Sequence, residues 1–252
     1  MADNNRGQHT PGMFVWRELY TPDTKAAKNF YGEVLGWRFE DVDMGGGAMY
    51  TLAYAGDKQI AGMFSQAGIP TMWNPYVSVT DVDAATKRAT DAGGQCVNGP
   101  MDIPNIGRMS TVIDPQGADV SIYRAAKGDS LLGRPSAGEF CWESLNSTDL
   151  AASKTFYANV FEWQSGSVKA GDVFTPKGMP ETQCASVNPA PPGAPASWLS
   201  HILVKNLTEA SDRAKRNGGK VLMDKVPVTG MGEFSVVQDP QGAVFSLFAA
   251  QT

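Results

Sequence analysis

The stretch from Phe14 to Trp37, FVWRELYTPDTKAAKNFYGEVLGW, returns 126 positions later as Phe140 to Trp163, FCWESLNSTDLAASKTFYANVFEW. The residues that return unchanged include Phe14, Trp16, Asp23, Lys28, Phe30, Tyr31 and Trp37. Two shorter motifs also return: Asp114 to Gly117 (DPQG) as Asp239 to Gly242, and Gly93-Gly94 as Gly218-Gly219. Such self-similarity is the signature of an internal repeat, and this repeat covers nearly the whole chain.

Each copy begins with a strand, continues as a helix and ends in several strands. Residues 15–20 form a strand-like run, Asp23 stands at an N-cap position, and Gly36 ends the helix. One apolar helix face is made by Ala26, Ala27, Phe30, Tyr31, Val34 and Leu35. Residues 37–42, 49–54 and 59–64 then alternate as strands, with glycine turns between them. The pattern predicts a βαβββ module.

A second module follows in each half. Its first strand and helix are expected at 76–79 and 83–92 in the first half, and at 201–204 and 208–217 in the second. The chain is therefore predicted to be an α+β protein of four βαβββ modules. We place domain 1 at residues 1–127, a linker rich in Gly, Pro and Ser at 128–138, and domain 2 at 139–252.

Composition and charge narrow the possible partners. A chain of 252 residues with 42% hydrophobic and 19% charged residues is long enough for two domains with their own cores. A net charge of -5 offers no basic stripe for phosphates, so no nucleic-acid partner is expected. The sequence has neither an apolar run near the roughly 20 residues that span a bilayer nor a signal-peptide pattern at its start. It predicts a cytoplasmic protein without a membrane partner, and a monomer or weak homodimer, because four modules can satisfy their pairing internally.

Cysteine and histidine are scarce. Cys96, Cys141 and Cys184 form no C-x-x-C pair and are predicted to be reduced core thiols. A nucleophilic cysteine needs a base beside it, and the two histidines are His201 and His9, the latter in a terminal segment expected to be mobile. The glycine run at 45–47 lacks the strand-to-helix context of a nucleotide-binding loop, so no cofactor is expected.

The run D-x-x-x-A-x-x-F-Y-x-x-V-L-G-W at 23–37 and the paired D-P-x-G turns resemble those of the vicinal-oxygen-chelate superfamily. This superfamily contains glyoxalases, bleomycin resistance proteins and extradiol dioxygenases, and the chain is most similar to its tandem two-domain, glyoxalase-like subgroup. The resemblance implies two glyoxalase-like domains whose curled mixed sheets surround clefts. It does not fix the chemistry, since one fold hosts unrelated functions.

The resemblance also implies where the ligands of a metal ion would lie. The first-strand position, seven residues before the capping aspartate, is Trp16 in the first half and Trp142 in the second. The other equivalent positions are Gly62, Asn74 and Ser121 in the first half, and Ser186, Leu199 and Ser246 in the second. None of these residues is His, Cys, Asp or Glu, so no metal is expected.

Strand alternation indicates which side chains share the face of these positions. The first cleft is expected to contain Trp16, Glu18, Tyr20, Asn74, Tyr76, Asp119, Ser121 and Tyr123. The second is expected to contain Trp142, His201 and Ser246 among more apolar neighbours. Aromatic rings with a few polar groups are typical of a small-molecule pocket, although a tryptophan on an inner strand also fits a cleft that is simply filled.

Glu18 and His201 are the candidate catalytic residues. A carboxylate on the same face as two aromatic rings is costly to bury unless it meets a partner, a ligand or water, which makes Glu18 the main polar candidate. His201 titrates in a range that suits a general base, although a lone histidine also fits a structural role.

Three functions stay open at this point. The first is metal-independent binding of a small aromatic or amphipathic molecule, chiefly in the first cleft. The second is a glyoxalase-like lyase or isomerase, or a hydroxylase-like oxidoreductase, with Glu18 or His201 as its general base. The third is a non-catalytic structural or signalling protein with filled clefts.

The ligand-equivalent positions lead to a first prediction. Elemental analysis of the purified, desalted protein should find no stoichiometric divalent metal, because a catalytic site usually needs three His, Cys, Asp or Glu ligands. About one zinc, nickel, iron or manganese per chain would contradict it.

Overall fold

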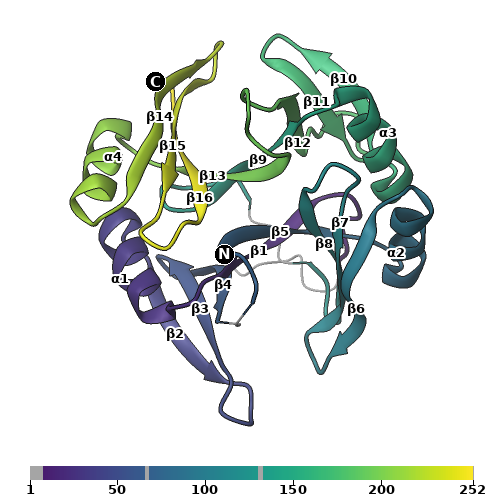
Figure 1. Cartoon of the computed structure of the whole chain (residues 1–252), viewed down its shortest axis with the longest axis horizontal. Helices are drawn as coiled ribbons and strands as arrows, with labels where there is room; N and C mark the ends of the chain where they lie inside the picture. Colours follow the sequence, from purple (N-terminus) through teal and green to yellow (C-terminus); the bar gives the residue numbers. More distant parts are fainter. Residues whose placement is uncertain (1–7, 66–67, 130–132, 252) are drawn as a thin grey trace. The chain divides into compact units, whose positions relative to one another are not determined.

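The computed structural model describes residues 8–65, 68–129 and 133–251 of the chain. It contains four helices, which are α1 (Thr24–Leu35), α2 (Val82–Asp91), α3 (Leu150–Phe161) and α4 (Leu207–Arg216). The strands of the first half are β1 (Phe14–Tyr20), β2 (Arg38–Asp43), β3 (Met49–Ala55), β4 (Lys58–Phe64), β5 (Met72–Ser78), β6 (Gln95–Ile103), β7 (Gly107–Ile113) and β8 (Asp119–Ala125). Those of the second half are β9 (Phe140–Ser147), β10 (Gln164–Val168), β11 (Gly171–Thr175), β12 (Ala185–Pro189), β13 (Ser197–Leu203), β14 (Lys220–Val228), β15 (Gly232–Gln238) and β16 (Val244–Ala250). Figure 1 labels these elements.

The strands form two mixed sheets with the same order. The first runs β2-β3-β4-β1-β5-β8-β7-β6 and the second runs β10-β11-β12-β9-β13-β16-β15-β14. In every module the first strand pairs in parallel with the last, as β1 does with β4 and β5 with β8. The other pairs within a module are antiparallel. The predicted α+β fold of four βαβββ modules is therefore confirmed.

The helix ends follow the expected capping chemistry. Asp23 has an extended backbone, and its carboxylate accepts a hydrogen bond from the Ala26 amide, which satisfies one of the first free N–H groups of α1. Gly36 ends the same helix at φ 72°, in the left-handed region that glycine adopts without strain. In the second half Asp149 caps α3 in the same way, but Glu162 takes the left-handed position at φ 58°.

The chain divides into two compact units, and each combines segments of both repeats. Among the described residues, unit 1 contains 8–16, 75–129, 133 and 143–198, and unit 2 contains 17–65, 68–74, 134–142 and 199–251. In unit 1, α2 lies beside α3, and in unit 2, α1 lies beside α4 (Figure 1). The predicted boundaries 1–127 and 139–252 describe the repeat in the sequence and stay a prediction. Of the predicted linker 128–138, residues 130–132 lie outside the described part of the chain.

A buried hydrogen-bond chain joins the two repeats inside each unit. In unit 2 the Tyr31 hydroxyl donates to Asp239 at 3.0 Å and accepts from the Trp73 indole at 2.9 Å. Burial, reinforced by the nearby carboxylate, raises the pKa of Tyr31 well above its ordinary value, so the phenol keeps its proton and stays a donor. Burial also raises the pKa of Asp239, against the lowering effect of its hydrogen bonds with Tyr31 and with backbone amides.

Unit 1 contains the same arrangement, made by the equivalent residues of the other repeats. The Tyr157 hydroxyl donates to Asp114 at 3.0 Å and accepts from the Trp198 indole at 2.9 Å. The second oxygen of Asp114 accepts from the amides of Gln116 and Ala118, which closes the DPQG turn around the carboxylate. The aspartate of the motif therefore fixes its own turn and also binds the helix of the other repeat.

The glutamine of each DPQG motif binds the start of the same helix. In unit 1 the side-chain oxygen of Gln116, Oε1, accepts hydrogen bonds from the backbone amides of Thr148 and Asp149 at 2.8 and 2.7 Å, directly before α3. In unit 2 the side-chain oxygen of Gln241, Oε1, accepts hydrogen bonds from the Thr21 hydroxyl and the Asp23 backbone amide at 2.8 and 2.9 Å, directly before α1. Free N–H groups at a helix start need such partners, so the motif completes a helix cap supplied by a distant segment.

The double glycines explain the close packing beneath these helices. A Cβ atom on Gly94 would lie 2.9 Å from the Phe156 ring and 2.9 Å from the Ile113 carbonyl. A Cβ atom on Gly219 would meet the Phe30 ring and the Gln238 carbonyl, each at 3.0 Å. Only glycine fits there without a shift of the helix, which accounts for the return of this residue in both repeats.

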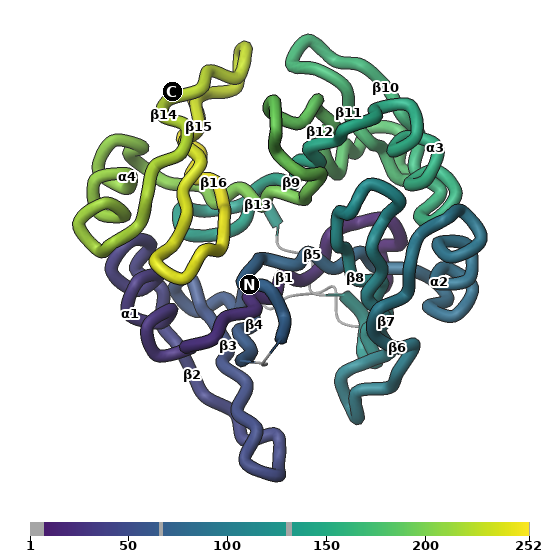
Figure 2. Tube along the Cα trace, viewed as in Figure 1, coloured from purple at the N-terminus to yellow at the C-terminus, as the bar shows by residue number. Residues whose placement is uncertain are grey.

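Aromatic rings fill the core of both units around these tyrosines. In unit 2, Tyr31 stacks on Trp37 with ring centroids 5.4 Å apart, and in unit 1 Tyr157 stacks on Trp163 at 5.8 Å. Hairpins carry the exposed apolar residues; the β2–β3 hairpin, with Met44 and Met49, projects beyond α1 (Figure 2). Across the described residues, none of the helices has the length and apolar character needed to cross a membrane.

The buried chain leads to a stability prediction. Tyr31→Phe should lower the free energy of unfolding by about 1–3 kcal/mol, because it leaves the Asp239 carboxylate and the Trp73 indole N–H buried without their shared partner. Urea unfolding measures the effect. Tyr54→Phe is the matched control, since its hydroxyl binds Glu40 at an exposed site and its loss should cost less than about 0.5 kcal/mol. Equal stabilities for the two variants would contradict the assignment.

Candidate functional site

The structure distributes the predicted site residues over both units. Unit 1 contains Trp16, Tyr76 and Ser121. Unit 2 contains Glu18, Tyr20 and Asn74, together with the three residues expected in the second cleft, which are Trp142, His201 and Ser246. The site is therefore described unit by unit, and the grouping of the first six residues in one cleft stays a prediction.

Unit 1 has a small cavity beside Trp16, which we call the Trp16 cavity. Its volume is about 160 Å³, and its lining includes Trp16, Tyr123, Lys127 and Asp129. Trp16 is only half-buried, so its ring is not part of the closed core. The predicted neighbour Tyr76 is buried behind Tyr123, with the two rings edge to face at 5.9 Å. An aromatic wall therefore meets a polar edge at this cavity.

The chemistry of the aromatic wall is set by burial. Tyr123 donates its hydroxyl to the Ile106 carbonyl at 3.0 Å. Burial, with a contribution from the negative charge of Asp129, raises the pKa of Tyr123 to about 12. The phenol is therefore neutral at physiological pH, and its ring provides a flat surface for stacking.

Asp129 is a residue that the sequence analysis missed, because it lies within the predicted linker. Its Oδ2 atom accepts from the Ser78 hydroxyl at 2.6 Å and from the Thr10 amide at 2.6 Å. The Asp129 amide donates to the Gln8 carbonyl at 2.8 Å, so the segment before β1 is tied to the end of β8. The expectation of a mobile segment around His9 is therefore wrong for these residues. His9 and Asp129 lie 120 positions apart in the sequence, and no local pattern connects the two stretches.

The imidazole of His9 lies beside the same carboxylate. Its Nδ1 atom is 3.6 Å from Asp129 Oδ1, a contact too long for a hydrogen bond but close enough for an ion pair when the imidazole is charged. The Asp129 side chain has no exposed surface, whereas about a fifth of the His9 side chain is exposed. The carboxylate therefore orients the ring from its buried side.

In unit 2 the candidate Glu18 lies on β1 in register with Gly62 of β4. A Cβ atom built on Gly62 would come within 1.8 Å of the Tyr50 hydroxyl oxygen, so the phenol of Tyr50 occupies the place of a side chain at position 62. Residues in register on adjacent strands present their side chains to the same face, which places the Tyr50 hydroxyl on the Glu18 face. Tyr50 was not predicted, because only the absent side chain at Gly62 makes room for it.

The other predicted residues of this face are more deeply placed. The Asn74 amide donates to the Tyr20 hydroxyl at 3.4 Å, and both residues are buried. Trp142, the equivalent of Trp16 in the second repeat, is half-buried. In unit 1, Ser121 is fully buried and its hydroxyl shares a 2.9 Å hydrogen bond with Thr111.

His201 lies in a closed apolar setting. It is 6% exposed, in register with the buried Ser246, and its ring meets the Phe234 ring edge to face at 5.4 Å. Burial lowers the pKa of His201 to about 4, so the imidazole is neutral at physiological pH. A base is most effective when its pKa lies near the working pH, so this setting favours a hydrogen-bonding role over proton transfer. Its assignment as a catalytic residue stays a prediction.

The cysteines are free, but only one of them is a core residue. Cys184 is buried, and burial raises the pKa of its thiol, which disfavours the nucleophilic thiolate. Cys96 is half-buried and packs against the core, and Cys141 is half-buried, so the prediction of core thiols holds fully only for Cys184.

The model of the Glyoxalase/Bleomycin resistance protein/Dioxygenase superfamily matches the chain twice, at residues 13–122 and 141–247. The chain belongs to this superfamily. The resemblance inferred from the repeat is thereby confirmed, including its occurrence as two tandem copies.

Two relatives align with this chain along almost its whole length. A protein of Mycobacterium bovis named "Putative glyoxylase CFP32" is 30% identical over 253 residues, which covers 96% of this chain and 96% of that protein. The anthracycline biosynthesis protein DauV of Streptomyces sp. is 28% identical over 258 residues, which covers 94% of this chain and 93% of that protein.

Solved structures share the superfamily fold at low sequence identity. The Mn(II)-bound glyoxalase from Novosphingobium aromaticivorans has a TM-score of 0.62 at 16% identity and covers 95% of this chain and 82% of its own. The 2,3-dioxygenase LapB from Pseudomonas sp. KL28 has a TM-score of 0.62 at 13% identity. The match covers 96% of this chain and 94% of LapB. At such identities the likeness concerns the fold alone.

The side chains at the superfamily's ligand positions do not fit a metal ion. The positions inferred from the resemblance hold an indole, a hydrogen, an amide and a hydroxyl in the first half, at Trp16, Gly62, Asn74 and Ser121. Transition-metal sites require imidazole, thiolate or carboxylate ligands. Within residues 8–65, 68–129 and 133–251, no three or more His, Cys, Asp or Glu side chains are grouped so that they could hold a metal.

Asp119, at the start of β8, leads to a prediction about pH. Burial, reinforced by the charge of Asp114, raises the pKa of Asp119 from 3.8 to about 6. The folded protein then holds this proton more tightly than the unfolded chain, so folding loses stability as the pH rises from about 4 to about 6. Asp119→Asn removes this loss and should raise the stability above pH 7 by about 1–2 kcal/mol, after allowance for screening of a partly exposed group.

Urea unfolding at pH 4 and at pH 8 measures this effect. Asp172→Asn is the control of opposite sign, because Lys154 and Ser167 lower the pKa of Asp172. The Asp172 carboxylate stabilises the folded state at pH values above the pKa that it has in the unfolded chain. This stabilisation is lost as the pH falls through its lower pKa in the folded protein. An Asp119→Asn variant that gains nothing between pH 4 and pH 8 would contradict the prediction.

Proposed function

We propose that the chain binds a small aromatic or amphipathic molecule, without a metal ion, in the Trp16 cavity of unit 1. One observation carries the proposal: the residue at the superfamily's first-strand ligand position is a half-buried tryptophan that lines a cavity with Tyr123. A ring that only replaced a lost ligand in a filled interior would be closed off from such space. A half-buried indole that lines a cavity is instead a surface on which another ring can stack.

The size and lining of the cavity support this class of ligand. An apolar cavity of about 150 Å³ in another protein holds benzene, so about 160 Å³ is suited to a single aromatic ring. Lys127 and Asp129 lie at the polar edge, where they can contact a hydroxyl, carbonyl or amine on the ligand. The rest of a larger molecule would extend out of the cavity.

The names of the relatives agree with a small-molecule ligand. CFP32 is named as a glyoxylase, and DauV is named for anthracycline biosynthesis. An anthracycline contains fused aromatic rings, which is the chemistry that Trp16 and Tyr123 would recognise by stacking.

A second candidate function is proton transfer by an enzyme with Glu18 as its general base. The observation that favours it is the Tyr50 hydroxyl, which lies on the Glu18 face in the place of a side chain at Gly62. A carboxylate and a phenol on one face can act as base and acid on a carbonyl-containing substrate. The metal-dependent reactions of the superfamily are not assigned to this chain, because the residues at the ligand positions do not fit a metal.

Ligand-observed NMR and calorimetry test the proposal with a panel of neutral aromatic compounds such as phenol, indole and naphthol. Binding should persist after dialysis against EDTA, and Trp16→Leu should weaken it at least about tenfold because the stacking surface is lost. Trp142→Leu is the matched control, since it removes the equivalent tryptophan of the other repeat and should leave binding unchanged.

The outcomes separate the open functions. Binding that disappears with EDTA and returns with a metal, or that Trp142→Leu abolishes while Trp16→Leu does not, would contradict the proposal. Recovery of the ligand unchanged supports a binding protein. Conversion of the ligand that Glu18→Gln abolishes identifies the second candidate, and absence of any binding favours a structural or signalling protein with filled clefts.

A further inference from the structure

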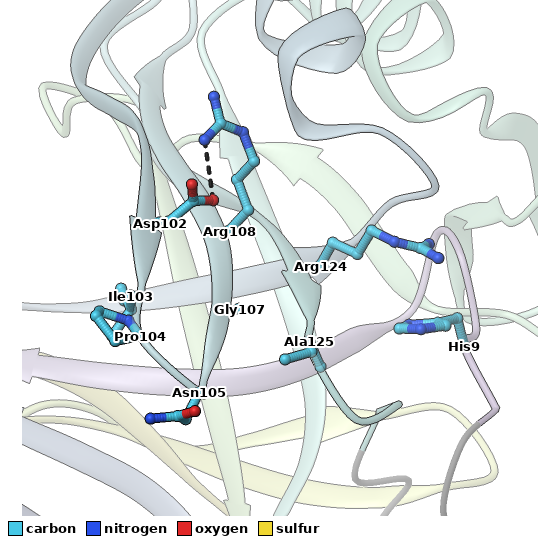
Figure 3. A pocket seen from close by; sticks show the side chains of 10 residues that line it. His9, Asp102, Ile103, Pro104, Asn105, Gly107, Arg108, Arg124 and Ala125 are labelled. Atoms are coloured by element: carbon cyan, nitrogen blue, oxygen red, sulfur yellow. Dashed lines mark hydrogen bonds and ion pairs between the residues drawn. The ribbon is translucent and has the colours of Figure 1, made fainter.

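Unit 1 has a second and larger cavity, on the side of Arg124, which we call the Arg124 cavity. It is a depression largely open to solvent, with a volume of about 390 Å³. The turn between β6 and β7, the end of β8 and the segment around His9 form its walls (Figure 3). It shares only Asn105 and Ala125 with the lining of the Trp16 cavity, and Trp16 and Tyr123 do not line it.

One of the two arginines in this lining is already neutralised. Arg108 binds both oxygens of Asp83, at 2.7 and 2.8 Å, and donates to Asp102 at 3.0 Å. These charge-assisted hydrogen bonds raise the pKa of the Arg108 guanidinium above its ordinary value. Asp102 is the one carboxylate of the lining, and Arg108 holds it.

The other arginine has most of its hydrogen-bonding capacity left. Within the part of the chain that the structure describes, Arg124 makes no ion pair and one hydrogen bond, at 3.5 Å to the Val79 carbonyl. Arg124 is half-buried, and its side chain extends toward His9, which also lines the cavity (Figure 3). A guanidinium has five N–H donors, arranged as a fork that matches the two oxygens of a carboxylate or phosphate.

His9 adds a second polar group to the lining next to Arg124. Because its Nδ1 atom faces the buried Asp129, the Nε2 atom is the one left to act toward the cavity. The remaining wall is apolar or small, with Ile103, Pro104 and Ala125.

We propose that the Arg124 cavity binds the oxyanion group of a small carboxylate- or phosphate-bearing molecule, with Arg124 as its main contact and His9 beside it. The apolar wall accommodates a short aliphatic or cyclic portion of the same molecule. This site is separate from the aromatic cavity of the proposed function and does not depend on it.

Calorimetry on the full chain at low ionic strength tests the proposal with inorganic phosphate, butyrate and 1-butanol. At least one of the two anions should bind with a Kd of about 0.1–1 mM, and 1-butanol, which lacks the charge, should not bind. Arg124→Gln should weaken anion binding at least about tenfold. Arg38→Gln is the matched control, because this exposed arginine packs over the Tyr54 ring in unit 2 and its loss should leave the Kd unchanged.

Two comparisons make the result specific. Phosphate binding without butyrate binding assigns a phosphate-bearing ligand, and the reverse assigns a carboxylate. If Arg124→Gln fails to fold, as shown by its melting curve, His9→Gln should weaken binding several-fold. The proposal is overturned if neither anion binds, if folded Arg124→Gln binds like the wild type, or if Trp16→Leu abolishes anion binding.

Discussion

The structure depends on a buried hydrogen bond between a helix tyrosine and the aspartate of a DPQG turn that belongs to the other repeat. Tyr31 with Asp239 and Tyr157 with Asp114 are equivalent pairs, each joined at 3.0 Å and each bonded to a buried tryptophan. Burying an unpaired carboxylate or phenol at such sites would cost folding free energy, so each group of a pair holds the other in position. The pairs explain why a compact unit takes one module from each repeat, whereas the sequence divides the chain into halves.

This constraint leaves the strands near the cavities free to carry polar and aromatic side chains. The core is built on the helix side, by rings such as Trp163 and Trp198 in unit 1, and does not include Trp16. The tryptophan on β1 is half-buried and lines a cavity.

Much of the fold follows from local patterns in the sequence. The helix ends at Asp23 and Gly36 were predicted correctly because capping depends on adjacent residues. The DPQG motif was recognised as part of the repeat, but its role was not, because Gln116 and Gln241 act on helices far from them in the sequence. Strand alternation placed Trp16 and Tyr123 on one face, and both line the same cavity.

The parts of the site that could not be predicted arise from side chains that meet only in the folded chain. His9 and Asp129 come from the two ends of the first half, and their contact depends on backbone pairing near Ser78. Tyr50 takes the place of a missing side chain at Gly62, which no pattern in the strand itself reveals. In the sequence, Arg124 cannot be distinguished from a surface arginine. Only the structure shows that Arg108 is paired with Asp83, whereas Arg124 donates to the Val79 carbonyl.

The central claim is that a tryptophan at the superfamily's first-strand ligand position serves a metal-free aromatic binding site. A crystal structure of the metal-depleted protein with a bound aromatic ligand tests it most directly. Electron density for the ligand ring is expected against Trp16 and Tyr123, with no anomalous signal from a transition metal nearby. A metal ion bound at these positions, or a ligand ring bound elsewhere with the Trp16 cavity empty, would contradict it.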